Sequence, residues 1–402
     1  PIVIWSLILA VIIELALHLN LNDLPYKFLN HTTGPIRKLG QYSKKEVIPN
    51  DYISIVGDSN VYGFGPWLYQ NSWSMGQPTF ATHHLLHNGL NRDIIAFGYP
   101  GYGTFGSCLS MVSEMEMLKN SWIWSKIELP DRILVVFYEG NDLINNLHEL
   151  EQRGYDISQE ITQFSEEKLR MIITKESKKI SRSFSVIDHC ASWNLFSGLV
   201  KNYINKYIPT KRNQVIGTNT DSLRIHSEKL VDNNYSVSDN ILVKRENTAV
   251  IGNIETFIGF CEGPALHLSK NEINLALEIA RLSLTHLSLK FPDSEIDLVY
   301  LPSSLSIYQF GSSDLRPAPL IMRGDYRDKT FKPAEAIQKN QSLRQNVLKI
   351  ANSLGFGFID TTSAMKERAK FHLLHGPKDP IHLNRKGYEA FSEILINELQ
   401  LN

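Results

Sequence analysis

The stretch Tyr52-Ile53-Ser54-Ile55-Val56-Gly57-Asp58-Ser59-Asn60 decides the fold. Its apolar run, residues 53–56, is typical of a buried strand in a parallel sheet. Ligands and chemistry collect beyond the carboxyl ends of such strands, so Ser59 is a candidate nucleophile. The alternative is a turn without chemistry, because glycine, aspartate and serine all favour turns.

Four more apolar runs of this kind follow along the chain, at residues 93–97, 132–138, 296–301 and 356–359. Helical patterns separate them, near residues 79–90, 105–122, 269–290, 333–354 and 384–399. Strands that alternate with helices predict a three-layer α/β/α domain with a mostly parallel sheet, and we assign it to residues 51–402.

A long insertion interrupts this alternation at about residues 145–264. It holds a charged helical stretch (147–180), a more apolar one (184–208) and a segment rich in Asn, Ser and Thr (210–240). We interpret the insertion as a lid or a partner-binding element. Its charge is also compatible with a simple solvated face.

The composition excludes several classes of function. Hydrophobic residues make up 43% of the 402 residues and charged residues 21%, which is typical of a globular protein. A net charge of −1 gives no global basic field, so we expect no nucleic-acid partner. The three cysteines have no zinc spacing. Among His83, His84 and His87, two histidines four residues apart on a helix could bind a metal, but no third ligand is evident in the sequence. We therefore predict no metal and no cofactor.

The first residues predict a membrane anchor. Residues 2–19 are almost wholly apolar and would span roughly 27 Å as a helix, close to the thickness of a bilayer core. We expect an uncleaved transmembrane signal-anchor helix at 1–20 and a juxtamembrane linker at 21–50; a buried helix of a soluble domain is the alternative. Glu14 is costly in lipid, so it would face a partner helix, reach the interface or be protonated. A membrane-protein partner would then bind through Glu14 or the insertion.

The chemistry of acyl transfer needs a nucleophile, a base, a residue that orients the base, and donors for the oxyanion. Asp379 and His382 supply the orienting group and the base, because side chains three residues apart in a helical turn can meet. Asp142 is the rival orienting carboxylate. The glycines of residues 98–103 bring backbone N–H groups close to whatever binds there.

Four ordered blocks of the sequence resemble the SGNH (GDSL-like) hydrolases. They are Gly57-Asp58-Ser59, Gly98-x-x-Gly101, Glu139-Gly140-Asn141-Asp142 and Asp379-x-x-His382. The chain departs from the family pattern at Asn60, where Leu or an aromatic residue is commoner, at Ala96, often Asn, and at Glu139, usually Gly. The resemblance covers residues 51–400 outside the insertion.

This resemblance implies a flavodoxin-like parallel sheet and a serine mechanism. Ser59 would attack an ester carbonyl, His382 would act as general base and then acid, and Asp379 would orient His382. The oxyanion would be held by the Ser59 and Gly101 N–H groups and the Asn141 side chain. Asp58 and Asp142 would shape the turns.

The expected function is a membrane-anchored serine esterase that removes acyl groups, acetyl above all, from an ester-bearing small molecule, glycan or lipid. A single anchor suggests an extracytoplasmic, periplasmic domain that works on envelope glycans or lipids. Two alternatives remain open at this point. One is an O-acyltransferase that moves an acyl group to a glycan hydroxyl, and the other is a non-catalytic accessory subunit of a membrane complex.

Overall fold

The computed structural model describes most of the chain, and the statements below refer to that part. The described residues are 2–20, 35–65, 79–120, 127–157, 164–183, 190–207, 247–259, 261, 263–316, 330–376, 379 and 381–401.

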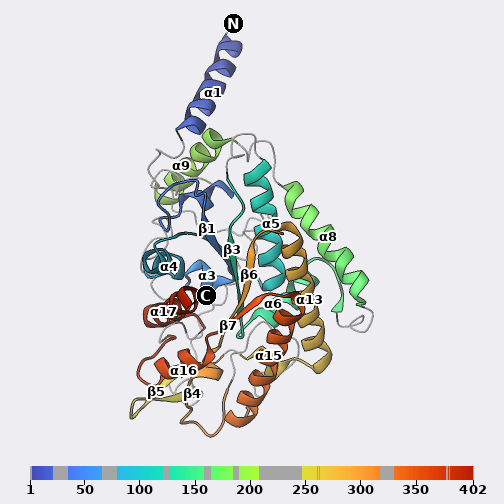
Figure 1. Cartoon of the computed structure of the whole chain (residues 1–402), viewed down its shortest axis with the longest axis vertical. Helices are drawn as coiled ribbons and strands as arrows, with labels where there is room; N and C mark the ends of the chain where they lie inside the picture. Colours follow the sequence, from blue (N-terminus) through green and yellow to red (C-terminus); the bar gives the residue numbers. More distant parts are fainter. Residues whose placement is uncertain are drawn as a thin grey trace.

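A five-stranded parallel sheet forms the centre of the molecule (Figure 1). Its strands are β1 (Tyr52–Gly57), β2 (Asp93–Gly98), β3 (Arg132–Tyr138), β6 (Glu295–Leu301) and β7 (Gly357–Asp360), in the spatial order β2-β1-β3-β6-β7. Each neighbouring pair is parallel. The predicted parallel sheet and its five strands are confirmed. The carboxyl ends of the strands lie at one edge of the sheet, and the candidate site residues Ser59 and Asn141 follow two of these ends.

Helices cover both faces of the sheet, which gives a three-layer α/β/α arrangement (Figure 1). One face carries α5 (Thr104–Asn120), α6 (Asp142–Gln152), α8 (Glu166–Ser183), α13 (Lys270–Lys290) and α15 (Pro333–Leu354). The other carries α4 (Thr82–Leu90), α16 (Thr362–Ala369) and α17 (Arg385–Leu401). A capping box of Ser269 and Glu272 begins α13.

Two hydrophobic cores follow from the alternation of side chains along each strand. In β3, Ile133, Val135 and Phe137 belong to the core under α5 and α13, while Leu134 and Val136 belong to the core under α4 and α17. Successive side chains of a strand point to opposite faces, so a strand that is apolar throughout needs cover on both sides.

The edge of the sheet at β2 is covered by a segment that the sequence suggested was a linker. The short 3-10 helix η2 (Pro35–Gly40) packs Ile36 and Leu39 into the core. The Gln41 side chain then hydrogen-bonds both the N–H and the carbonyl of Ala96, at 2.8 Å each. The predicted linker of residues 21–50 is therefore wrong for residues 35–48, which belong to the domain and shield an open strand edge.

The insertion contributes regular structure in its described part. Helix α8 packs against α5 and α13, so it extends one outer layer of the domain. An antiparallel hairpin, β4 (Asn247–Ile251) and β5 (Ile254–Gly259), was not predicted from the sequence. The short helices α12 (Pro264–His267) and α14 (Ser304–Ile307) follow. The predicted Asn-, Ser- and Thr-rich segment lies outside the described residues.

A helix is present at the beginning of the chain, α1 (Ile2–Leu19), which projects away from the layers (Figure 1). Helix α9 (Ala191–Tyr207) of the insertion packs against it. Over the residues that the structure describes, no helix combines the length and apolarity needed to cross a membrane, so the predicted transmembrane helix is not confirmed.

Candidate active site

The candidate nucleophile begins a short helix just after β1, which lies between β2 and β3 in the sheet. Asp58 caps α3 (Ser59–Tyr62), and its Oδ1 accepts a hydrogen bond of 2.8 Å from the Asn60 backbone N–H. Such a cap satisfies an N–H group that the first turn leaves without a partner. Ser59 is thus fixed at the carboxyl edge of the sheet, with 5% of its surface exposed.

The candidate base and its orienting carboxylate lie in the loop before α17. His382 Nδ1 is 2.7 Å from Asp379 Oδ2, while Asp379 Oδ1 accepts from the backbone N–H groups of Ile381 and His382, at 3.2 Å each. Burial alone would raise the pKa of Asp379. The His382 charge, its ring hydrogen bond and the two backbone donors outweigh burial and hold that pKa below its usual value.

These contacts determine which nitrogen of the imidazole carries the proton. An ionised carboxylate can only accept, so His382 Nδ1 must donate to Asp379. The Nε2 lone pair then faces Ser59 Oγ, which lies 2.9 Å away. The arrangement can therefore take a proton from the serine hydroxyl, which is the step that makes serine nucleophilic.

The loop that carries His382 is held on both sides. Tyr138, the last residue of β3, donates its hydroxyl to the Ile381 carbonyl at 3.0 Å. The Leu383 backbone N–H donates to Asn60 Oδ1 at 3.4 Å, a long bond that joins the loop to the Ser59 turn. Asn60, where the sequence departs from the SGNH pattern, thus helps to hold this loop. The role of Tyr138 was not predicted, because an apolar strand position is expected to belong to the hydrophobic core.

The glycine block meets the nucleophile turn through its first glycine. A Cβ on Gly98 would lie 2.3 Å from the Tyr62 backbone nitrogen, so only glycine allows α3 to pack this closely on β2. Gly101 lies in the turn beyond, with a φ of 79° in the left-handed region. The geometry therefore explains glycine at both positions. That the Gly101 N–H donates to the oxyanion stays a prediction.

Asn141 joins this group through Asp58. Its Nδ2 donates to Asp58 Oδ2 at 3.2 Å, and its side chain is buried next to the start of α6. An amide nitrogen carries two hydrogens, so the bond to Asp58 leaves one N–H for another acceptor. The structure therefore brings the predicted oxyanion residue to the same turn as Ser59, with a bridging carboxylate that the sequence did not reveal.

Two further carboxylates are buried nearby. Burial raises the pKa of Asp58, against the pull of its hydrogen bonds from Asn60 and Asn141 and of the nearby His382 charge. Burial, and then the charge of Asp58, hold the pKa of Asp142 well above its usual value. Asp142 Oδ2 accepts from the Thr104 hydroxyl at 2.8 Å. The carboxylate that contacts His382 is Asp379, and the rival Asp142 bonds elsewhere.

Glu139, which stands where the family usually has glycine, is the centre of a polar cluster at the end of β3. Its carboxylate accepts hydrogen bonds of 2.6–2.8 Å from the side chains of Tyr300, Ser303, Ser306 and Asn340. Burial raises its pKa, and these hydrogen bonds act in the opposite direction. These four donors fix the backbone at Glu139, two residues before Asn141. The cluster could not be predicted because its members are far apart in the sequence.

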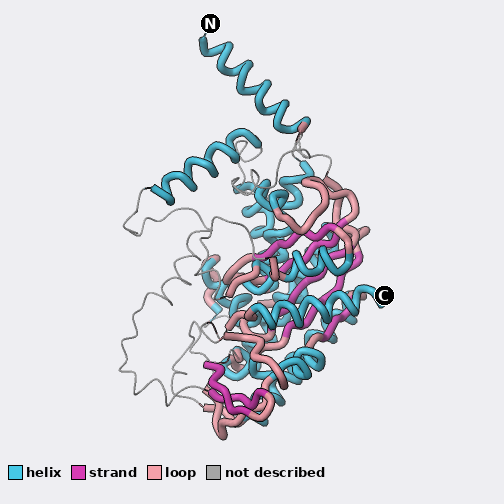
Figure 2. Tube along the Cα trace, turned by 90° about the vertical axis from the view of Figure 1, so that its left-hand side faces the viewer, coloured by secondary structure: helices cyan, strands magenta, loops and turns pink. Residues whose placement is uncertain are grey.

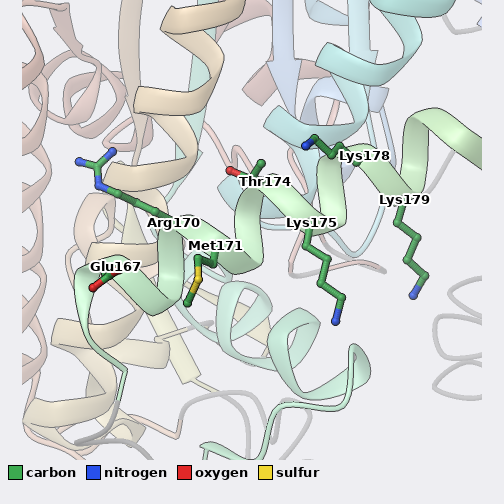
Figure 3. A pocket seen from close by; sticks show the side chains of 7 residues that line it. All are labelled: Glu167, Arg170, Met171, Thr174, Lys175, Lys178 and Lys179. Carbon is green, nitrogen blue, oxygen red and sulfur yellow. The ribbon is translucent and has the colours of Figure 1, made fainter.

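Other features of the chain lie apart from this group. His83 and His84 are buried, with ring centroids 4.4 Å apart, and in the described part no cluster of three or more His, Cys, Asp or Glu could hold a metal. A hollow of about 770 Å³ borders α8 (Figure 3). It is lined by Glu167, Arg170, Met171, Thr174, Lys175, Lys178 and Lys179. None of the candidate catalytic residues lines it.

Comparisons with known proteins add little to this geometry. No family model matches the chain, and no curated protein matches it. One crystal structure aligns with 87% of this chain and 97% of its own, at 10% sequence identity and a TM-score of 0.31. A likeness this weak carries no argument about fold or function.

Proposed function

We propose that the chain is a serine esterase of the SGNH (GDSL-like) type. The observation that carries the proposal is the continuous chain of hydrogen bonds from Asp379 Oδ2 through the His382 ring to Ser59 Oγ. This chain supplies a nucleophile, a base and an orienting carboxylate in the order that acyl transfer requires.

The first half of the reaction forms an acyl-enzyme. Ser59 Oγ attacks the ester carbonyl while its proton passes to His382 Nε2, and the carbonyl oxygen becomes an oxyanion. Asp379 keeps its charge beside the imidazolium that forms, which lowers the free energy of that state. When the tetrahedral intermediate collapses, the carbon–oxygen bond to the alcohol breaks and His382 returns the proton to the departing alcohol oxygen.

The second half releases the acid. Water gives a proton to His382 Nε2 as its oxygen attacks the acyl carbon, and the bond to Ser59 Oγ then breaks with return of that proton. In both halves the oxyanion would accept from the free N–H of Asn141 and from the backbone N–H groups of Ser59 and Gly101. Loss of one such donor typically costs about 3 kcal/mol of transition-state stabilisation.

A small acyl group fits the proposal best. Ser59 is only 5% exposed, and the Phe64 ring lies beside the His382 ring with centroids 5.2 Å apart. Both features limit the room beside the nucleophile. We therefore propose acetyl esters as the substrate class, and a p-nitrophenyl ester series should show turnover that falls as the acyl chain lengthens.

Labelling with a fluorophosphonate probe tests the serine mechanism. The wild type should be labelled, and Ser59→Ala and His382→Ala should not, with unchanged circular dichroism. Ser107→Ala is the matched control, because this serine donates to the Gly57 carbonyl of the same turn at 3.1 Å but does not touch His382. It should still be labelled. Labelling of Ser59→Ala, or a folded wild type that is never labelled, would refute the proposal.

A further inference from the structure

Helices α1 and α9 lie outside the α/β/α layers (Figure 2), and a hydrogen-bonded carboxylate joins the C-terminal half of α1 to the start of α9. Glu14 of α1 is buried and accepts from both the backbone N–H and the hydroxyl of Ser192, in the first turn of α9; the bond from the backbone N–H is 2.9 Å long. The partner sought for Glu14 from sequence is thus a helix of the same chain. A carboxylate is well placed there, because the N-terminus of a helix carries partial positive charge.

The surface of α1 is apolar over more than half of its circumference. Nine large apolar side chains are each at least 41% exposed: Ile4, Trp5, Ile8, Leu9, Val11, Ile12, Ile13, Leu15 and Leu19. With about 3.6 residues per turn, these positions form a band much wider than the stripe by which a helix packs on a protein core. The one acidic side chain of α1 faces α9 instead of this band.

Helix α9 continues the apolar surface. Its exposed large apolar side chains are 39–64% exposed and recur every three or four residues along one face: Trp193, Phe196, Leu199, Val200 and Tyr203. Ala10 and Ile13 of α1 line a hollow of about 230 Å³ together with Ser192, Trp193 and Phe196 of α9. The apolar faces of the two helices therefore meet at this hollow, and they contain aromatic side chains of the kind enriched where a bilayer meets water.

We propose that α1 and α9 together form a bilayer-docking surface, with α9 lying along the membrane interface and Glu14 holding it beside α1. The occupant is lipid because the exposed apolar side chains of α1 cover more than half of its circumference, which is wider than the stripe by which a helix packs into one protein groove. Amphipathic helices of this kind bury their apolar face at the boundary between headgroups and acyl chains. The Glu14 contact removes the cost of a free carboxylate at that depth.

An environment-sensitive fluorophore on α9 tests the proposal in the full chain. Cys108 and Cys261 are buried, so Cys190→Ser followed by Leu199→Cys gives one reactive thiol on α9 for NBD. Phosphatidylcholine vesicles should shift its emission to the blue. Leu289→Cys on α13 is the matched control, since Leu289 is 72% exposed but lies on the domain, and its emission should not move.

The Glu14→Ala variant tests the coupling. It should reduce the vesicle-induced shift at position 199 and leave intact the shift of a label placed through Leu9→Cys on α1. No shift at position 199 with vesicles, or an equal shift at position 289, would overturn the proposal. So would a shift without vesicles that grows with protein concentration, because the surface would then be buried against a second copy. None of these readouts depends on esterase activity.

Discussion

Replacement of Asp379 by Asn separates the role of a carboxylate from that of a mere hydrogen-bond partner. Asp379 Oδ1 accepts from two backbone N–H groups, those of Ile381 and His382. An asparagine has only one oxygen, and the two donors would draw that oxygen to their side. Its NH2 group would then face His382 Nδ1 and donate to it, so the ring proton would move to Nε2, which could no longer accept from Ser59.

The expected loss follows from this reversed tautomer. With binding groups intact, kcat should fall by about 10⁴-fold, which corresponds to roughly 5 kcal/mol of transition-state stabilisation, while KM changes little. The assay is hydrolysis of p-nitrophenyl acetate together with the rate of fluorophosphonate labelling. Asp142→Asn is the matched control, because Asp142 bonds to the Thr104 hydroxyl instead of to His382. Its loss should be far smaller.

Two outcomes would refute this reasoning. If Asp379→Asn kept a tenth or more of the wild-type kcat, the carboxylate would not be selecting the tautomer. If Asp142→Asn remained folded and lost as much kcat as Asp379→Asn, our assignment of Asp379 as the carboxylate that orients His382 would be wrong.

Two further predictions concern the loop that carries His382. Asn60→Leu removes the acceptor of the Leu383 N–H and a donor to the buried Asp58 carboxylate, so unfolding free energy should fall by about 2 kcal/mol in urea melts, with a lower kcat. Unchanged stability would contradict that contribution. The pKa of Asp379 is lower in the folded protein than in the unfolded chain, so its ionised form stabilises the fold. This contribution is present above the ordinary carboxyl pKa of about 3.9 and is lost as the pH falls through the lower pKa of the folded state. The Tm gap between the wild type and Asp379→Asn should therefore persist at pH 6 and close below pH 4; a gap that closed between pH 6 and 5 would argue against it.

Much of the fold could be predicted because the sheet is buried on both faces. Each of its five strands is a short apolar run followed by a polar turn, and such runs are visible in sequence. The cover over β2 was missed because Gln41 binds backbone groups of the sheet through its side chain, which produces no periodic pattern. The β4–β5 hairpin was missed because polarity does not follow burial there: Asn247 of β4 is buried, whereas Ile254 and Phe257 of β5 are exposed.

The candidate site was predictable to the extent that its parts follow strand ends. Ser59 lies two residues after the end of β1 and Asn141 three residues after the end of β3, and His382 is three residues from the carboxylate that contacts it. The contacts of Glu139 could not be predicted, because its donors lie more than 160 positions further along the chain. Long-range polar contacts of this type depend on the tertiary structure alone.

The hydrogen bond between Ser59 and His382 joins positions separated by 323 residues. A nascent chain can form β1 and the Ser59 turn early, yet it has no base until the loop before α17 has been synthesised and has docked. Contacts this distant in sequence form slowly, since their loop-closure entropy must be overcome first. If Ser59 is the nucleophile that we propose, it stays unreactive until this loop has docked, and esterase activity would report that α17 has reached its place.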